Sequence, residues 1–258
     1  MTTAATTPRR IALVTGASRG LGRASALKLA EQGIDLILTY QRGEAQAQEV
    51  VQQAERLGRR AVALQLDVGE SSSFDAFAAR VKAVLASQWQ REQFDYLVNN
   101  AGTGLHASIA ETTEAQFDAL VNIHLKGTFF LTQKLLPLIA DGGRIVNTSS
   151  GLARFSFPGY AAYAAMKGGV EVLSRYMAKE LGPRGISVNT VAPGAIETDF
   201  NGGAVRDTAQ LNAQIAGVTA LGRVGLPEDI GTAVATLLAE GNGWINGQRI
   251  EVSGGMML

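Results

Sequence analysis

The sequence predicts an α/β fold: a single doubly wound domain built on a mostly parallel, seven-stranded sheet. Short runs rich in leucine and β-branched residues alternate with longer helical patterns along the chain. These runs are almost continuously apolar, which is typical of parallel strands that helices cover on both faces. Because neither a Pro/Ser-rich linker nor an internal repeat divides the 258 residues, we expect one domain spanning residues 1–258.

The alternation places the elements one after another. The expected strands are residues 11–15, 35–40, 61–67, 96–100, 144–150, 186–192 and 248–254. The expected helices are residues 21–32, 44–57, 72–88, 113–139, 160–181 and 227–239. Residues 197–222 break this rhythm with glycines and polar residues before a short helical pattern. We interpret this segment as a substrate lid over the strand ends, with an ordinary surface loop as the alternative.

Composition excludes several classes of function. The 23 basic and 23 acidic residues balance, so no charge excess indicates nucleic acid or an anionic membrane as a partner. There is no cysteine for disulfides or thiolate metal sites, and the two histidines, His106 and His124, are too few for a histidine-rich cluster. No apolar run approaches the ~20 residues that span a bilayer, and residues 1–10 lack the apolar core of a signal peptide. We therefore expect a cytoplasmic protein without a metal site.

A glycine-rich turn follows the first expected strand. In VTGASRGLGRA, Gly16, Gly20 and Gly22 lie between that strand and a helix. Glycines allow a sharp turn and close approach to a pyrophosphate, and the helix N-terminus favours anions. The turn therefore indicates a dinucleotide site, and a tight turn without a ligand is the alternative.

Two further strand ends carry polar residues. Asp67 ends the third expected strand, where its carboxylate can accept a hydrogen bond from an adenine amino group or cap the helix near Ser71. NNAG, residues 99–102, ends the fourth, at the edge where open α/β sheets bind ligands. Its asparagines can brace neighbouring turns and Gly102 can let a cofactor pass close by. A plain strand-ending turn explains NNAG equally well.

The alanine-rich run YAAYAAMKGG raises the question of a catalytic pair. On a helix, Tyr163 and Lys167 are four residues apart and share a face, so their side-chain ends can meet. The Cα atoms of Tyr160 and Lys167 are ~10 Å apart along the helix axis, so only Tyr163 is placed for Lys167 to act on its hydroxyl. The alternative is that these aromatic residues simply pack in the core.

These motifs, taken in order, resemble the short-chain dehydrogenase/reductase family. The resemblance is carried by TGASRGLG, NNAG, Asn122, Ser150 thirteen residues before Tyr163, PGAIET at 193–198 and the closing NGQRIEVSGG. It runs from about residue 9 to the end. It implies a Rossmann fold of the short single-domain branch, similar to 3-oxoacyl-[acyl-carrier-protein] reductase-like members.

The resemblance also implies roles for individual residues. Tyr163 becomes the acid/base, Lys167 its partner, Ser150 the group that orients the carbonyl, and Asn122 the residue that holds a water linked to Lys167. From the residues alone Ser149 is an alternative orienting group, and the spacing to Tyr163 favours Ser150. We expect the Lys167 cation and an oxidised nicotinamide to lower the pKa of Tyr163 below its ordinary value near ~10. The implied cofactor contacts are Gly16, Ser18, Arg19, Gly20, Leu21, Gly22, Tyr40, Arg42, Asp67, Val68, Asn99, Ala101, Gly102, Tyr163, Lys167, Pro193, Gly194, Ile196 and Thr198.

The resemblance leaves the substrate side open. Its expected pocket walls are Leu152, Phe155, Tyr160 and part of 197–215, with core packing as an alternative for Tyr160. His106 is interpreted as a loop residue near the pocket and His124 as a helix-face residue.

The second expected strand indicates the cofactor. Tyr40 stands where NAD-selective enzymes carry an acidic residue for the ribose hydroxyls. Arg42 and Arg19 lie within reach of a 2′-phosphate, and ordinary solvated surface charges are the alternative. We therefore expect NADP(H), preferred over NAD(H).

The sequence thus predicts an oxidoreductase that moves a hydride between nicotinamide and a carbonyl or secondary alcohol. One alternative is a 3-oxoacyl-[acyl-carrier-protein] reductase, for which Arg184 would face the carrier while Asp141 argues against it. The other is a redox sensor that binds NADP(H) without turnover, against which the intact Ser150, Tyr163 and Lys167 argue. The resemblance also implies a homotetramer. Apolar positions supporting it are Val170, Val172, Leu173, Met177, Phe129, Leu131 and Leu135, and the C-terminal GMML could pack on another subunit.

Overall fold

The computed structural model describes residues 9–258. Seven strands form one sheet in the order β3-β2-β1-β4-β5-β6-β7, and every neighbouring pair is parallel. The predicted fold is confirmed, and the sheet is wholly rather than mostly parallel. The sequence prediction that residues 1–10 are not a signal peptide falls mostly on residues 1–8. These residues lie outside the described part of the chain. Within residues 9–258, no helix is long and apolar enough to cross a membrane.

The strands form where the sequence is most continuously apolar. Their bounds are β1 Ile11–Val14, β2 Asp35–Tyr40, β3 Ala61–Gln65, β4 Phe94–Asn99, β5 Ile139–Thr148, β6 Ser187–Pro193 and β7 Arg249–Val252. All residues of β1, β2, β4 and β6 are buried, as expected for strands covered on both faces. The strand expected at 144–150 begins earlier, because Ile139 already pairs with Phe94 before the register shifts.

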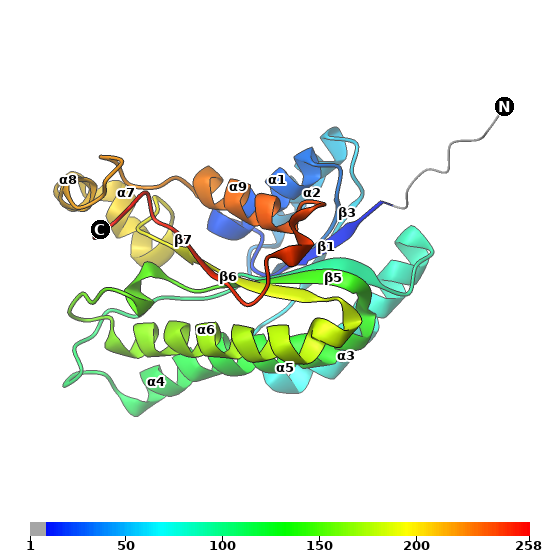
Figure 1. Cartoon of the computed structure of the whole chain (residues 1–258), viewed down its shortest axis with the longest axis horizontal. Helices are drawn as coiled ribbons and strands as arrows, with labels where there is room; N and C mark the ends of the chain where they lie inside the picture. Colours follow the sequence, from blue (N-terminus) through cyan, green and yellow to red (C-terminus); the bar gives the residue numbers. More distant parts are fainter. Residues whose placement is uncertain (1–8) are drawn as a thin grey trace.

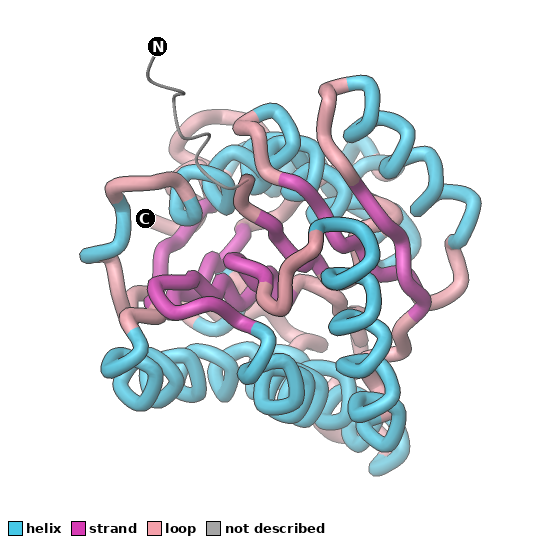
Figure 2. The backbone as a smooth tube through the Cα atoms, turned by 90° about the vertical axis from the view of Figure 1, so that its right-hand side faces the viewer, coloured by secondary structure: helices cyan, strands magenta, loops and turns pink. Residues whose placement is uncertain are grey.

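Helices cover both faces of the sheet (Figures 1 and 2). Those on one face are α1 Gly20–Glu31, α2 Glu44–Arg56 and α9 Pro227–Leu238, and those on the other are α3 Phe74–Val84, α5 Gly127–Leu135 and α6 Ala161–Leu181. α4, Glu114–Leu120, begins at a capping box in which Thr113 and Gln116 exchange hydrogen bonds of 3.0 and 3.3 Å. Each face buries its own apolar cluster, so the sheet itself separates two cores.

The helix expected at 113–139 is not continuous. A π-helical stretch, Val121–Lys126, separates α4 from α5, and a 3₁₀ turn at Leu136–Leu138 follows before β5 begins. π-Helical turns widen a helix locally and occur frequently at functional sites. This stretch carries both Asn122 and His124, so the interruption falls where the sequence placed a catalytic residue.

A chain of buried amides joins the sheet to the helices beneath it. Asn99 on β4 donates hydrogen bonds to Thr132 on α5 (3.0 Å) and to Asn147 on β5 (2.8 Å). Asn147 is fully buried and donates in turn to Ser174 on α6 (2.9 Å). Buried polar groups are tolerated when they are paired in this way. These buried hydrogen bonds fix the positions of α5 and α6 relative to β4 and β5.

The segment expected as a lid lies at the end of the molecule toward which the strands point (Figure 1). It contains two short helices, α7 Ala204–Asp207 and α8 Ala209–Gly217, rather than the single helical pattern expected. Backbone bridges anchor it on both sides, between Ile196 and Gly225 and between Thr219 and Met256. Asn201 and the two glycines after it adopt left-handed conformations, which turn the chain sharply before α7.

Candidate active site

Helix α6 brings Tyr163 and Lys167 to the carboxyl end of β5. Both side chains are buried, with exposed fractions of 7% and 5%. Lys167 Nζ donates a 2.8 Å hydrogen bond to the carbonyl of Thr148 and lies 5.6 Å from the centre of the Tyr163 ring. Tyr160 precedes the first turn of α6 and packs edge-on against His106. The structure therefore brings together the pair that the four-residue spacing selected.

The two serines after β5 point in different directions. Ser149 is buried; its hydroxyl donates to Glu171 (2.6 Å) and also lies 3.2 Å from the carbonyl oxygen of Lys167. Ser150 is half-buried, and a hydrogen bond with Tyr163 is among the interactions acting on that phenol. Because the hydroxyl of Ser149 is occupied inside the protein, Ser150 is the serine that faces the catalytic tyrosine.

In the unliganded chain the pKa of Tyr163 is raised, and the lowered value expected with an oxidised nicotinamide bound stays a prediction. Burial is the dominant influence and raises the pKa of this phenol well above 10, while the hydrogen bond with Ser150 lowers it by less. Burial likewise disfavours the Lys167 ammonium and lowers its pKa to about 8. The expectation did not include desolvation, which is the largest effect on both groups. In the unliganded chain Tyr163 is therefore a neutral phenol at pH 7.

The π-helical stretch places His124 against Tyr163. The His124 ring lies 5.4 Å from the Tyr163 ring at 87°, and its Nε2 lies 2.8 Å from the carbonyl of Thr103. Asn122 is half-buried in the same stretch, where its carbonyl accepts a hydrogen bond from Gly127. Sequence reasoning assigned His124 only to a helix face, because nothing local to it showed that the face meets Tyr163. The role of Asn122 stays a prediction.

The glycine turn has the shape that a phosphate requires. A side chain on Gly22 would lie 2.3 Å from the carbonyl oxygen of Gly16, and one on Gly16 would lie 2.9 Å from Ala101. Gly16 and Gly20 also adopt positive φ angles of 64° and 55°. The first turn of α1 contains no acidic residue, and no side chain caps its start at Arg19. Its N–H groups are therefore free to meet an anion, which fits a dinucleotide pyrophosphate.

The NNAG segment mainly braces its neighbours. Both N–H groups of the Asn99 amide are donated inside the protein, so the donors of that side chain are not available to a cofactor. Asn100 donates to the carbonyls of Thr15 and Gly16, at 3.0 and 3.4 Å, and so holds the glycine turn. Asn100 therefore braces a neighbouring turn as expected, whereas Asn99 ties β4 to α5 and β5. The missing side chain of Gly102 makes room for His124, whose ring would lie 2.8 Å from a Cβ there.

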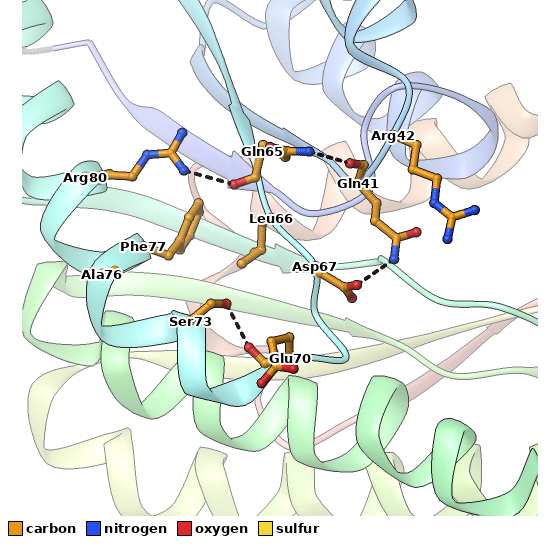
Figure 3. Close-up of a pocket in the computed structure, with 10 residues that line it drawn as sticks. All are labelled: Gln41, Arg42, Gln65, Leu66, Asp67, Glu70, Ser73, Ala76, Phe77 and Arg80. Atoms are coloured by element: carbon orange, nitrogen blue, oxygen red, sulfur yellow. Dashed lines mark hydrogen bonds between the residues drawn. The ribbon is translucent and has the colours of Figure 1, made fainter. Parts of the chain in front are cut away.

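A cavity of about 470 Å³ opens beyond the ends of β2 and β3 (Figure 3). Arg42 and Asp67 line it together with Gln41, Gln65, Leu66, Glu70, Ser73, Ala76, Phe77 and Arg80. Asp67 accepts hydrogen bonds from Gln41 (2.7 Å) and from the backbone of Gly69 (2.8 Å), so it caps a local turn and not the helix near Ser71. Tyr40 is only 9% exposed, and burial followed by the nearby Glu44 carboxylate raises the pKa of its hydroxyl.

The remaining predicted contacts surround the same strand edge. Thr198 lies above Gly20, with its methyl group 3.7 Å from the position of a Cβ there. Gly194 packs against Ser253 and donates to the carbonyl of Val252 (3.1 Å). Ser18 faces Gly43, while Leu21 and Ile196 pack against the apolar cluster under α1. Val68 packs against the cluster on the other face of the sheet, and Pro193 ends β6.

Aromatic side chains gather in front of Tyr163. Phe200, from the segment expected as a lid, lies 5.8 Å from the Tyr163 ring. Phe155 and Phe157 contact each other at 5.6 Å in the segment before α6. The expected pocket wall stays a prediction, and Phe200 is the residue of the lid segment that the structure places against Tyr163 on α6. Its place could not be read from the sequence, since residues 197–222 carry no clear periodicity.

Arg184 is engaged by contacts within the chain. It forms a 2.7 Å ion pair with Asp141 and donates to the carbonyls of Leu136 (3.0 Å) and Ile139 (2.5 Å). These residues lie at the amino ends of β5 and β6, on the opposite edge of the sheet from Tyr163. Asp141, which already argued from the sequence against a carrier-facing Arg184, thus engages its guanidinium, and the carrier-protein alternative stays a prediction.

The buried ammonium predicts a pH-dependent stability. Unfolded Lys167 binds its proton up to pH ~10.5 and the folded protein up to about 8, so the wild-type free energy of unfolding rises with pH between these values. Replacing Lys167 by Met removes this dependence. We expect the advantage of Lys167→Met in unfolding free energy at pH 7 to shrink by roughly 2–3 kcal/mol by pH 10. Urea denaturation at both pH values measures it, with Lys82→Met on the exposed face of α3 as the control.

Comparison with known proteins places this geometry in a family. A family model described as enoyl-(acyl carrier protein) reductase matches residues 16–257. A hydroxynaphthalene reductase-like protein of Metarhizium brunneum is 36% identical, over 96% of this chain and 97% of its own. A promiscuous reductase that catalyses keto-reduction at C1 in lugdunomycin biosynthesis has 38% identity and a TM-score of 0.91, over 96% and 97% of the two chains. The angucycline C-6 ketoreductase with bound NADP has 35% identity and a TM-score of 0.91, over 96% and 95%.

These matches cover nearly the whole chain, and their shared fold is the one found here. The glycine turn, the loop after β4 and the serine–tyrosine–lysine group meet at one edge of a parallel sheet, as the motif resemblance implied. The chain belongs to the short-chain dehydrogenase/reductase family of oxidoreductases.

Proposed function

We propose that this protein is an NADPH-dependent carbonyl reductase in which Tyr163 is the proton donor. The observation that carries the proposal is the meeting of Ser150, Tyr163 and Lys167 beside the glycine turn. When bound, the reduced nicotinamide supplies a hydride to the carbonyl carbon. The carbonyl oxygen then takes the proton of the Tyr163 hydroxyl, and the products are an alcohol and NADP⁺.

Each catalytic side chain has a defined task in this reaction. Ser150 donates a hydrogen bond to the substrate oxygen as negative charge develops there. Tyr163 keeps its proton at neutral pH, because burial raises its pKa, and so is ready to act as an acid. The Lys167 cation stabilises the phenolate that remains after the proton has left. Its hydrogen bond to Thr148 holds the ammonium near the ring throughout.

The pocket wall favours a flat aromatic substrate. Phe200 lies against Tyr163, and Phe155 and Phe157 contact each other in the segment before α6. Aromatic faces bind planar rings by offset or edge-on stacking, so these side chains would suit such a ring at the approach to Tyr163. The similar proteins include a hydroxynaphthalene reductase-like protein and an angucycline ketoreductase. We therefore propose a ketone on a fused aromatic ring system as the substrate class. The segment 197–222 is proposed as the lid that closes over it.

Two alternatives predict different behaviour in a substrate panel. A 3-oxoacyl-[acyl-carrier-protein] reductase would prefer acyl thioesters, and a redox sensor would bind NADPH without oxidising it on any ketone. The engaged Arg184 gives the first no support, and the intact Ser150, Tyr163 and Lys167 argue against the second. NADPH oxidation with fused-ring ketones, acyl thioesters and simple ketones separates all three.

Tyr163→Phe is expected to lower kcat on the best ketone of that panel by ~10²–10⁴, the usual contribution of general acid catalysis. The dissociation constant for NADPH should change little. Tyr160→Phe is the matched control and should have a far smaller effect on kcat, because Tyr160 lies outside the first turn of α6. Equal losses in the two variants would contradict the assignment of the proton donor.

The preference for NADP(H) over NAD(H) rests on charge near the end of β2. Position 40 is a tyrosine and not an acidic residue, so its side chain does not repel a 2′-phosphate. The exposed Arg42 lines the cavity beside it. Arg19 is 73% exposed and lies 3.7 Å from Asp199. Arg206 also forms an ion pair with Asp199, at 2.5 Å. The Arg19 side chain can therefore move to a phosphate while the Asp199 carboxylate keeps an ion-pair partner. Both arginines can therefore form charge-assisted hydrogen bonds to the phosphate.

Arg42→Ala is expected to reduce kcat/KM for NADPH relative to NADH by roughly 10- to 100-fold, or about 1–3 kcal/mol. Raising salt should weaken wild-type binding of NADPH more than of NADH. Steady-state kinetics with both cofactors measures the effect, and Arg56→Ala on the exposed side of α2 is the control. A wild-type preference for NADH would contradict the arginine argument.

The homotetramer and the cytoplasmic location stay proposals. Four of the apolar residues expected to support assembly, Val170, Met177, Leu131 and Leu135, are instead buried within one chain, and Leu173 packs against its core. Exposed apolar side chains do remain on α4, α5 and α6, with exposed fractions of 40% at Phe117, 42% at Phe129, 39% at Phe130, 46% at Val172 and 65% at Tyr176. At the C-terminus Met256 is buried, whereas Leu258 is 96% exposed. This surface supports pairing of α5 and α6 across a two-fold axis.

Val172→Glu is expected to break the assembly, because a carboxylate would be buried at the centre of the paired surface. Sedimentation at micromolar concentration should show a tetramer for the wild type and smaller species for the variant. The circular dichroism spectra of both proteins should be those of a folded chain. Gln52→Glu on the opposite face is the control. A wild-type monomer under these conditions would rule out the tetramer.

A further inference from the structure

A charged network lies against the segment that carries Ser150, and the reaction proposed above does not use it. Its members alternate in sign, in the order Glu171 on α6, Arg249 and Glu251 on β7, and Arg154 after β5. The side chains of Glu171, Arg249 and Glu251 are only 14%, 23% and 19% exposed. Taking charges out of water is unfavourable, and apolar side chains of similar volume often stabilise a fold equally well. Stability alone therefore does not explain these charges.

The Glu171–Arg249 ion pair contacts two neighbouring residues of the site. Arg249 Nε donates to Glu171 at 2.7 Å, and its Nη2 donates to the backbone carbonyl of Ser150 at 3.4 Å. Glu171 accepts in turn from the hydroxyl of Ser149 at 2.6 Å. The backbone N–H of Ser149 donates to the carbonyl of Val191 on β6 at 2.7 Å. The backbone of Ser149 and Ser150 is thus held from α6, β6 and β7 at once.

The far end of the network returns to the same segment. Glu251 accepts a hydrogen bond from Arg249 (2.9 Å) and two from Arg154 (both 2.6 Å). Arg154 follows Ser150 by four residues and also donates to the carbonyl of Met256 at 2.7 Å. Hydrogen bonds from Arg154 and then from Arg249 lower the pKa of Glu251 to about 2, so its carboxylate stays ionised across the physiological range. The segment from Ser150 to Arg154 is therefore tied to β7 at both ends.

The direction of the Ser150 hydroxyl depends on this backbone. Its Oγ accepts a hydrogen bond from the N–H of Leu152 at 3.2 Å, at the start of the 3₁₀ turn Gly151–Ala153. The hydroxyl keeps its own hydrogen to donate toward Tyr163; burial is the larger influence on the pKa of that phenol, and the hydrogen bond with Ser150 opposes it. Hydrogen bonds weaken steeply as their angle bends. A small rotation of the Ser150 backbone would therefore misdirect the donor.

We propose that the Glu171–Arg249 ion pair is a positioning unit for Ser150: it fixes the backbone of Ser149 and Ser150, so that the Ser150 hydroxyl donates to the substrate oxygen in one set direction. The pair acts through Ser150 rather than on the substrate. A donor that is already oriented stabilises the negative charge developing on that oxygen without having to reorganise first. The inference rests on the proposed reductase function, which defines the task of Ser150.

A charge-free replacement of the pair separates positioning from stability. The double variant Glu171→Leu/Arg249→Met exchanges both charges for apolar side chains, and Ser149 keeps the carbonyl of Lys167 as an acceptor at 3.2 Å. We expect its Tm to stay within a few degrees of wild type or to rise. We expect kcat for ketone reduction to fall at least ~10-fold, a part of the ~10²–10³ that one whole oxyanion donor contributes. The ketone KM and the NADPH dissociation constant should stay within ~3-fold of wild type.

Removing the Ser150 hydroxyl shows whether the pair acts through it. In a Ser150→Ala background there is no hydroxyl to orient, so adding Glu171→Leu/Arg249→Met should lower kcat by less than ~3-fold more. Single-turnover oxidation of NADPH, followed by its absorbance, measures hydride transfer in the slow variants. Arg56→Met on the exposed side of α2 is the control and should behave as wild type.

Three results would overturn the inference. The ion-pair variant could keep the wild-type kcat, its Tm and kcat could fall together, or its loss of kcat could be as large without the Ser150 hydroxyl as with it. A wild type that reduces no ketone would instead defeat the proposed function.

An independent readout needs neither substrate nor cofactor. The N–H of Leu152 donates to Ser150 Oγ, so the hydrogen exchange of this amide reports whether the hydroxyl is held in place. We expect the Leu152 amide to exchange at least ~10-fold faster in Glu171→Leu/Arg249→Met than in the wild type, and at the wild-type rate in Arg56→Met. An unchanged exchange rate of Leu152 in the ion-pair variant would overturn the inference even if the reductase function stands.

Discussion

The buried ammonium of Lys167 is the constraint around which the site is organised. Its hydrogen bond to the Thr148 carbonyl ties α6 to the end of β5, and the same contact places the cation beside Tyr163. Taking a charge out of water is unfavourable, and the lowered pKa of Lys167 is the measure of that penalty. A hydrophobic residue there would suit the fold better. The penalty is understandable only if the cation acts on the phenol, so stability and function oppose each other at this position.

The surroundings of this pair are rigid because backbone and buried amides, rather than long side chains, define them. Asn100 holds the glycine turn through the carbonyls of Thr15 and Gly16. Asn99 and Asn147 lock the neighbouring strands to α5 and α6. Short, fully paired groups of this kind lose little conformational entropy on folding and resist displacement. The edge of the sheet is therefore shaped for a cofactor before any ligand binds.

A second network supports the serine side of the site. Glu171 on α6 accepts hydrogen bonds from Ser149 (2.6 Å) and from Arg249 on β7 (2.7 Å). Glu251 pairs with Arg249 and with Arg154, at 2.9 and 2.6 Å, and these partners lower its pKa to about 2. The network joins the last strand to the segment that carries Ser150. It explains why Ser149 is engaged inside the protein although its neighbour Ser150 interacts with Tyr163.

The sequence by itself determined the α/β class, the seven strands, the glycine turn and the Tyr163–Lys167 pair. These features are local: they follow from periodicity, from glycines in a turn and from a four-residue spacing on one helix. Only the tertiary structure decided which serine faces Tyr163, that burial raises the pKa of Tyr163, and that Asp141 occupies Arg184. The place of His124 beside Tyr163 is of the same kind, since it depends on a π-helical stretch meeting α6. Desolvation and contacts between distant segments exist only once the chain has packed, and no local pattern encodes them.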